Sequence, residues 1–231
     1  MNDYLLFIDT EASGLPKNWT LPYDSPGNWP FCVQISWLIF TKKGQKIKEE
    51  NHYIKDNDFS IDASATKVHG ITRDLLDKKG EYRKDILQML IEDFAIYNPL
   101  VVGHFMQFDL HMLGADYYRA DLEDPFKNAA TFCTMLGSTY LIKNPAVRFL
   151  RLEQLYEILF KKNLENFHDA IVDAGATAAC FFEMMKRGEI NDEIIRQQQK
   201  EFFEKKYSSE KYGCLPMVSL IVLTVLILFY L

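Results

Sequence analysis

Five side chains in three separate segments of this sequence have the chemistry to bind metal ions and activate water. Asp9 and Glu11 follow one apolar run, Asp109 follows a second, and His168 precedes Asp173 by five positions. Carboxylate oxygens are preferred ligands of Mg²⁺ and Mn²⁺. Histidine, with an unperturbed pKa of about 6.5, suits general-base work near neutral pH. Four acids and one base form the inventory that two-metal phosphodiester hydrolysis needs, so the pattern predicts that class of chemistry.

Asp9 and Glu11 stand at the end of a predicted strand over residues 4–9. Side chains alternate between the two faces of a strand, so these two acids share a face and Thr10 points to the other. Two carboxylates so close repel each other unless a cation lies between them. A solvated strand end is the alternative explanation. The apolar run before Asp9 indicates a buried central strand, which favours a functional role.

His168 and Asp173 converge only under one arrangement of the local backbone. Positions five apart on one helix are separated by about 140° around its axis, so His168 must lie in the loop before the helix. Asp169 suits an N-cap at this boundary. Taken alone, His168 leans towards a structural role, and Asp109 is explained equally well by charge complementarity at a helix N-terminus. The joint presence of all five residues favours a site, whose negative charge we expect to raise the pKa of His168.

The elements that must position these residues alternate between strand and helix after an antiparallel start. Strands are predicted at residues 4–9, 32–40, 46–54, 100–103 and 129–132, and helices at 81–97, 107–118, 133–141, 150–161, 169–187 and 191–207. The second and third strands should form a hairpin, and the whole pattern predicts an α/β sandwich with a mixed sheet. A long loop before residue 31 carries Trp19, Tyr23 and Trp29, which either stack on bases or cover the sheet edge.

Three motifs together resemble those of the DEDDh, or DnaQ-like, 3′–5′ exonucleases. They are Asp-Thr-Glu-x-x-Gly-Leu-Pro at residues 9–16, His-x-x-x-Phe-Asp at 104–109 and His-x-x-x-x-Asp at 168–173. Val-His-Gly-Ile-Thr at residues 68–72 resembles a further recurrent element of the family. The resemblance covers residues 3–187 and implies a ribonuclease H-like three-layer fold with a mixed central sheet. The chain departs from the family pattern at Ala12, where Thr is frequent, and at Phe105, where Asn is frequent.

The resemblance also implies a role for each residue of the motifs. Asp9 would bridge two Mg²⁺ or Mn²⁺ ions. Glu11 and Asp173 would complete the site of the water-bearing ion. Asp109 would serve the second ion, and His168 would be the general base. Substrate contacts would come from Thr10, Ala12, Leu15, His69, Phe105 and Phe108. The implied reaction releases nucleoside 5′-monophosphates from free 3′ ends of single-stranded or frayed nucleic acid. DNA and RNA stay open, as does a membrane-tethered nucleic-acid-binding protein whose exonuclease fold is catalytically silent.

Composition limits the ways in which this chain can bind a polyanion such as nucleic acid. The net charge of −6 argues against coating nucleic acid by electrostatics alone, but it does not exclude an enzyme that reaches phosphate through bound cations. The four cysteines, Cys32, Cys133, Cys180 and Cys214, show no paired metal-ligand spacing. We expect buried, reduced thiols in a reducing compartment. The N-terminus has neither a basic region nor a long apolar segment, so a cleaved secretory signal is not expected.

The last 18 residues differ in composition from the rest of the chain. Residues 214–231 carry no charge and are mostly Leu, Ile and Val, while Lys205, Lys206 and Lys211 precede them. As a helix they would span about 27 Å, close to a hydrocarbon core of about 30 Å. We expect a C-terminal hydrophobic helix that anchors a cytoplasmic domain to a membrane, with a buried helix of the domain as the alternative. The expected division is an exonuclease domain at 1–187, a charged helix and linker at 188–213, and the tail at 214–231.

Overall fold

The central sheet places the acidic strand in its middle. The computed structural model describes residues 2–211, and its five strands take the order β3-β2-β1-β4-β5. These strands are β1 (Tyr4–Ala12), β2 (Cys32–Thr41), β3 (Lys46–Tyr53), β4 (Leu100–Gly103) and β5 (Thr131–Cys133). Pairing is antiparallel from β3 through β2 to β1, and parallel from β1 through β4 to β5. The predicted mixed sheet and its β2–β3 hairpin are therefore confirmed.

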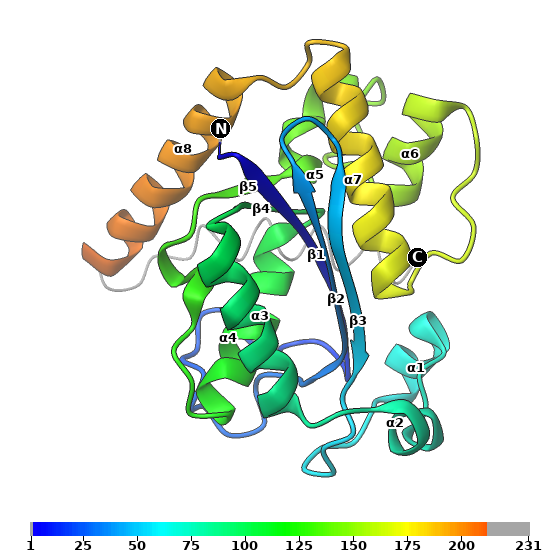
Figure 1. Cartoon of the computed structure of the whole chain (residues 1–231), viewed down its shortest axis with the longest axis vertical. Helices are drawn as coiled ribbons and strands as arrows, with labels where there is room; N and C mark the ends of the chain where they lie inside the picture. Colours follow the sequence, from blue (N-terminus) through cyan, green and yellow to red (C-terminus); the bar gives the residue numbers. More distant parts are fainter. Residues whose placement is uncertain (1, 212–231) are drawn as a thin grey trace.

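Helices cover both faces of this sheet and produce three layers (Figure 1). One face carries α3 (Arg83–Tyr97) and α4 (Met106–Arg119), and the other carries α6 (Leu152–Phe160) and α7 (Ala170–Lys186). The two helical layers contact alternate residues of β1, since Leu6 and Ile8 join the core under α3 and α4. Leu5 and Phe7 join the core under α6 and α7. This alternation decides which layer each residue at the end of β1 will face.

Helix α8 (Asp192–Lys211) covers the open edge of the sheet. The amide oxygen of Gln198 accepts from the backbone N–H of Cys133 at 2.6 Å, and its amide nitrogen donates to the Cys133 carbonyl at 3.2 Å. Gln198 thus pairs with edge strand β5 as a further strand would, and buried Ile195 packs beneath it. Within residues 2–211, Cys32, Cys133 and Cys180 are buried free thiols, as expected. Cys214 lies outside the described residues.

Two short helices, α1 (Ala63–His69) and α2 (Arg73–Lys79), were missing from the sequence prediction. Helix α1 buries no residue, so it shows no apolar periodicity. The capping residues were the feature of the sequence from which these two helices could have been predicted. Gly70 ends α1 in the left-handed region at φ 72°, and the Thr72 hydroxyl accepts from the Leu75 N–H at the start of α2. The Val-His-Gly-Ile-Thr segment is therefore the junction of two helices.

The helix predicted over residues 133–141 is wrong in its extent. It is a four-residue helix, α5 (Thr134–Gly137), followed by a 3₁₀ turn at Thr139–Leu141. Ser138 interrupts the helix at φ −106° and ψ 6°, and its hydroxyl donates to the Met135 carbonyl at 3.2 Å. A serine side chain that takes a nearby carbonyl competes with helical hydrogen bonding, which explains the break. A 3₁₀ helix at Pro125–Asn128 was also not predicted.

The hydrophobic helix expected at the C-terminus was assigned to the last 18 residues. Residues 214–231 lie outside the described residues. In the part of the chain that the structure does describe, no helix is both long and apolar enough to cross a membrane.

A buried ionic network ties the loop between β1 and β2 to α3 and α4. Asp116 is fully buried, and its carboxylate contacts Arg119 at 2.6 Å and Arg83 at 3.4 Å. It also accepts from the Cys32 N–H at 3.1 Å. Arg119 donates in turn to the carbonyls of Trp29 and Pro30, at the end of the loop. One carboxylate therefore holds two cations and a strand start in place.

We predict that Asp116→Ala lowers the free energy of unfolding by about 3 kcal/mol, because it removes the carboxylate that pairs with Arg119 and leaves the buried Cys32 N–H without its acceptor, while Arg83 keeps its pair with Asp58. Denaturant unfolding monitored by circular dichroism measures the change. Asp74→Ala, which breaks an exposed ion pair with Lys78, is the control and should change stability by less than about 0.5 kcal/mol. Similar small losses in both variants would contradict the structural role given to Asp116.

Candidate active site

Asp9 and Glu11 lie at the carboxyl end of β1 and face α7. They follow Leu5 and Phe7 on that side of the strand, whereas Thr10 follows Leu6 and Ile8 towards α4. The shared face predicted for the two acids is therefore confirmed. A β-bulge between Glu11 and Ala12 ends the regular pairing with β2 immediately after the acids. The strand thus terminates where the cavity begins.

Asp109 reaches the same place from the opposite layer. It lies in the first turn of α4 and is only 2% exposed. One carboxylate oxygen accepts from the Thr10 backbone N–H at 3.0 Å and from the Thr10 hydroxyl at 2.8 Å. The residue that points away from Asp9 and Glu11 therefore fixes the third acid. This contact was not foreseen from the sequence, where Thr10 was assigned only to the substrate.

His168 and Asp173 adopt the arrangement that their spacing requires. His168 lies in the loop at φ 67°, and Asp169 is the N-cap of α7, accepting from the Ile171 N–H. Asp173 sits one turn into the helix, and its carboxylate accepts from the His168 backbone N–H at 3.0 Å. Gln34 of β2 donates to Asp169 at 2.7 Å and ties the helix start to the sheet. The predicted boundary at Asp169 is confirmed.

The side chains of Glu11, His168 and Asp173 form a donor set that fits a divalent cation. One ligand atom of each lies within 4.8 Å of the others. One oxygen of Asp173 is buried and has no hydrogen-bond partner among the described residues. A buried, unsatisfied carboxylate oxygen is costly unless an ion binds it. Asp9 and Asp109 adjoin this set, since Asp109 and Asp173 both act on the pKa of Asp9 by charge repulsion.

The four acids resist ionisation when no cation is present. Burial is the main cause, and it raises the pKa of Glu11 to about 8, of Asp109 to about 8 and of Asp173 to about 7. Burial also raises the pKa of Asp9 well above its usual range, with repulsion from Asp109 next in weight. Bound cations would reverse this preference, so the cluster has the electrostatics of a metal site.

The expected direction of the His168 shift is wrong. Its pKa is lowered, chiefly because burial disfavours the imidazolium form. Glu153 raises the pKa and Arg151 lowers it, and both are smaller effects than burial. Desolvation therefore outweighs the attraction of nearby acids and favours a neutral imidazole that can accept a proton.

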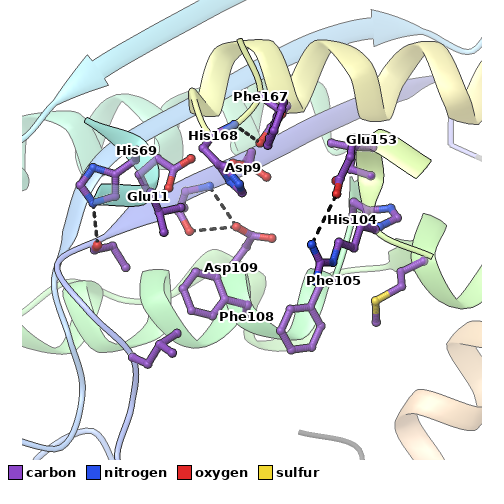
Figure 2. Close-up of a pocket in the computed structure, with 18 of the residues that line it drawn as sticks. Asp9, Glu11, His69, His104, Phe105, Phe108, Asp109, Glu153, Phe167 and His168 are labelled. Atoms are coloured by element: carbon purple, nitrogen blue, oxygen red, sulfur yellow. Dashed lines mark hydrogen bonds and ion pairs between the residues drawn. The ribbon is translucent and has the colours of Figure 1, made fainter. Parts of the chain in front are cut away.

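These residues line one cavity of about 320 Å³ between the two helical layers (Figure 2). The expected substrate-contact residues, Thr10, Ala12, Leu15, His69, Phe105 and Phe108, all line it. Their contact with a substrate stays a prediction. Figure 2 shows Phe105 and Phe108 next to Asp109, on the α4 side of the cavity. The His69 ring accepts from the Ile71 N–H and donates from Nε2 to the Ala12 carbonyl at 3.2 Å, which fixes it beside the end of β1.

The loop over residues 13–31 divides its aromatic residues between two roles. Trp29 is 3% exposed and stacks on His111 at 4.9 Å, and the Tyr23 hydroxyl hydrogen-bonds the same ring at 3.1 Å. These two residues act as apolar cover, but they pack on α4 and not on the sheet edge that was expected. Trp19 instead lines the cavity. Contact of Trp19 with a base stays a prediction.

Several residues of the cavity wall were not assigned to the site from the sequence, and four of them carry polar or aromatic side chains that bear on its chemistry. His104, Arg151, Glu153 and Phe167 also line it. His104 is held by Thr134 at 3.0 Å and by the Leu150 carbonyl at 3.0 Å, so it braces the wall. His104 is the first residue of the second motif, and this position could have identified it as part of the site. Arg151 and Glu153 belong to no spaced pattern, and only the packing of α6 against α7 brings them near His168.

Comparison with known proteins identifies similar sequences and folds. Residues 6–181 match a family model described as exonuclease. A PolC-type DNA polymerase III of Latilactobacillus sakei is 24% identical over 200 residues, which are 85% of this chain and 12% of that polymerase. The chain therefore spans a small part of the curated relative that it matches.

Solved structures of Escherichia coli exonuclease I have a similar fold. The zinc-bound complex with single-stranded DNA gives a TM-score of 0.66 at 21% identity, covering 80% of this chain and 41% of that chain. The complex with a dT13 oligonucleotide gives 0.64 at 19% identity, covering 90% and 44%. These TM-scores support the ribonuclease H-like fold. This chain spans less than half of each matched structure.

We predict that metal-free protein carries a pH-dependent penalty at this cluster. The folded-state carboxyl pKa values lie above their unfolded values near 4, so the folded state binds more protons between about pH 4 and pH 8. The cluster's contribution to stability is therefore lost as pH rises through this window. Asp9→Asn removes one repelling carboxylate, so in chelator its melting temperature should exceed that of wild type by a margin that grows from pH 5 to pH 8.

Thermal melts of both proteins with excess EDTA, and again with excess Mg²⁺, measure this difference. Added Mg²⁺ at pH 8 should stabilise wild type more than Asp9→Asn, because the variant lacks one charged ligand. If Asp9→Asn melts below wild type in EDTA at pH 8, the acids do not repel one another as described.

Proposed function

The chain belongs to the DEDDh, or DnaQ-like, exonuclease family, and on that premise we propose that it hydrolyses free 3′ ends of nucleic acid one nucleotide at a time. The product would be a nucleoside 5′-monophosphate. The observation that supports this most is the convergence of Glu11, His168 and Asp173 within 4.8 Å at the end of the central strand. Asp9 and Asp109 complete the acidic set from the strand and the opposite layer. Metal-assisted hydrolysis of a phosphodiester needs several carboxylates and a base at one point of a cavity.

Each residue of the set has a distinct task in the proposed reaction. Asp9, Glu11, Asp109 and Asp173 would hold the Mg²⁺ or Mn²⁺ ions. When bound, these ions supply positive charge for the substrate phosphate and the leaving oxygen. An imidazole nitrogen of His168 would accept the proton of the attacking water, for which burial favours the neutral form. Thr10 positions Asp109 through its two hydrogen bonds.

The proposed substrate is a single-stranded or frayed 3′ end of DNA or RNA. The solved complexes of exonuclease I with dT13 and dA16 oligonucleotides support single-stranded DNA as the first substrate to test. The proposed contacts are Thr10, Ala12, Leu15, His69, Phe105 and Phe108, which line the cavity with the acids. Leu15 is 37% exposed at this wall and is available to pack against a base.

We also propose that residues 214–231 anchor the protein in a membrane and leave the exonuclease domain on the cytoplasmic side. The support is compositional: no charge over 18 residues, with Lys205, Lys206 and Lys211 before them. The proposed division places the exonuclease domain at residues 1–187, the charged helix and linker at 188–213 and the tail at 214–231.

For the activity, we predict that the full-length protein in mild detergent releases mononucleotides from 3′-labelled DNA or RNA oligonucleotides with Mg²⁺ or Mn²⁺, and not with EDTA. Asp9→Ala should lower kcat at least about 100-fold, because loss of groups that merely support metal ligands already costs about 10- to 100-fold. His168→Gln should lower it about 100-fold or more through loss of the base. Glu92→Gln, on the exposed side of α3, is the matched control.

Chromatography of the labelled products separates mononucleotides from longer fragments. Release of mononucleotides by wild type and by Glu92→Gln alone is the expected result. Binding of oligonucleotides without degradation by any variant would instead favour a catalytically silent binding protein. Cleavage by Asp9→Ala at the wild-type rate would refute the proposed site.

For the tail, we predict that the full-length chain co-floats with liposomes and resists extraction by alkaline carbonate. Leu223→Arg places a charge near the middle of the apolar segment, at a cost of about 2.5–3.5 kcal/mol for insertion, and should shift the protein towards the unbound fraction. Leu223→Ala is the control and should stay bound. Equal flotation of both variants, or none by wild type, would contradict the anchor.

A further inference from the structure

Two buried polar residues of β2 lie directly across the strand pair from the acids. Ser36 is the register partner of Asp9, and Gln34 is the register partner of Glu11. Both β2 side chains therefore point to the α7 side of the sheet, where Ser36 is 0% and Gln34 is 1% exposed. A buried amide is costly unless its donors and its acceptor are paired. The partners of Gln34 therefore indicate what this side chain does.

The Gln34 amide uses both of its N–H groups and its oxygen, and these contacts lead to the start of α7. Nε2 donates to the side chains of Asn51 at 2.9 Å and Asp169 at 2.7 Å. Oε1 accepts from the backbone N–H of Ala170 at 3.2 Å. The amide thus holds the N-cap and the first residue of α7 together. Turning it over would set its oxygen against the Asp169 carboxylate, so the network permits one orientation.

The imidazole of His168 has no such support of its own. It lies with Glu11 and Asp173 at the acids (Figure 2), but no hydrogen bond to its ring nitrogens is found within residues 2–211. A general base is normally oriented by a third group that bonds to it. The direction of this imidazole must therefore be set by its backbone. Asp173 accepts from the His168 N–H at 3.0 Å, and Gln34 holds the two residues that follow.

The backbone of His168 needs this restraint. It adopts φ 67°, in the left-handed region, which residues other than glycine seldom occupy. Such a conformation persists only where the surrounding structure enforces it. The contacts of Gln34 with Asp169 and Ala170 enforce it from the C-terminal side. Without them the loop is free to relax into a commoner conformation, which turns the imidazole away from the acids.

We propose that Gln34 is a positioning residue, whose amide fixes the start of α7 and thereby directs the His168 imidazole toward Glu11 and Asp173. This inference rests on the proposed exonuclease function, in which His168 accepts the proton of the attacking water. Gln34 is not among the described residues that line the cavity, so it acts through His168 and not on the substrate. Its loss should therefore lower kcat and leave KM nearly unchanged.

The test measures hydrolysis of a 3′-labelled oligonucleotide by the full-length protein in mild detergent with Mn²⁺. Gln34→Leu removes the amide, and a displacement of about 1 Å near reacting groups can cost about 100-fold. We expect kcat to fall about 10- to 100-fold, with KM within about threefold of wild type. In a His168→Gln background the same change should cost less than about twofold, because the positioned group is absent. A residue that only stabilises the fold would cost as much in both backgrounds.

Reversal of donor and acceptor tests the hydrogen bond itself. Gln34→Glu sets two carboxylates against each other and should lose as much kcat as Gln34→Leu. Combined with Asp169→Asn, the new amide at position 169 donates to the new carboxylate, and its oxygen still caps α7. This pair should recover at least about fivefold of the lost kcat. Gln198→Leu removes an amide that pairs with Cys133 on edge strand β5, and as the matched control it should keep kcat within about twofold of wild type.

Nuclear magnetic resonance of the histidine ring nitrogens separates this inference from the proposed activity. The His168 signals are those that His168→Gln removes. In Gln34→Leu they should shift or broaden, whereas the signals of His69 and His104, whose rings have hydrogen bonds of their own, should stay in place.

Two results would overturn the positioning role and leave the exonuclease standing. They are unmoved His168 signals in Gln34→Leu, or a kcat of this variant within about twofold of wild type. Displaced His168 signals in a protein whose wild type degrades no oligonucleotide would refute the proposed function and keep the role of Gln34 in placing the imidazole.

Discussion

The cost of ionising four carboxylates at one point of the fold, three of them buried and Asp9 half-buried, is the constraint on which the rest of this structure depends. A central strand places Asp9 and Glu11 in the wall of the cavity, and α4 and α7 bring Asp109 and Asp173 to the same point. Burial disfavours the charge on each of them, and proximity adds repulsion. Such an arrangement is stable in its ionised form only with cations bound. The fold therefore places a group of acids where they can bind metal ions. Without bound ions, the ionised form of these acids destabilises the folded state.

The alternation of side chains along β1 determines which residues of the site face each helical layer. Residues facing α7 meet His168 and Asp173, and the one residue between the acids, Thr10, faces α4 and fixes Asp109. The same α4 terminus places Phe105 and Phe108 beside Asp109, so acidic and apolar parts of the cavity lining meet at one helix start. Cations bound by the acids would offset negative charge in a chain whose net charge is −6.

Much of this arrangement follows from local rules of strand and helix geometry that can be applied to the sequence alone. Strand periodicity predicted the shared face of Asp9 and Glu11, and helix geometry with an N-cap at Asp169 predicted His168 in the loop. Helices α1 and α2 were missed because α1 buries nothing and only its caps mark it. The fall in the pKa of His168 was missed because burial is a property of the packed molecule and outweighs nearby charge. The separate fates of Trp19 and Trp29 depend on contacts with α4 that no spacing within the loop encodes.

The most direct test of the central claim counts the protons released when the acids bind metal. With carboxyl pKa values of about 7 to 8 for Asp173, Glu11 and Asp109, part of the cluster is protonated at pH 7 in metal-free protein. Isothermal titration of Mn²⁺ into the full-length protein, in buffers of different ionisation enthalpy, measures this release. The account predicts Mn²⁺ binding with net proton release at pH 7, and less release at pH 9, where the acids are already ionised. Binding without proton release at pH 7, as at a solvated set of carboxylates, would contradict it, and so would the absence of binding.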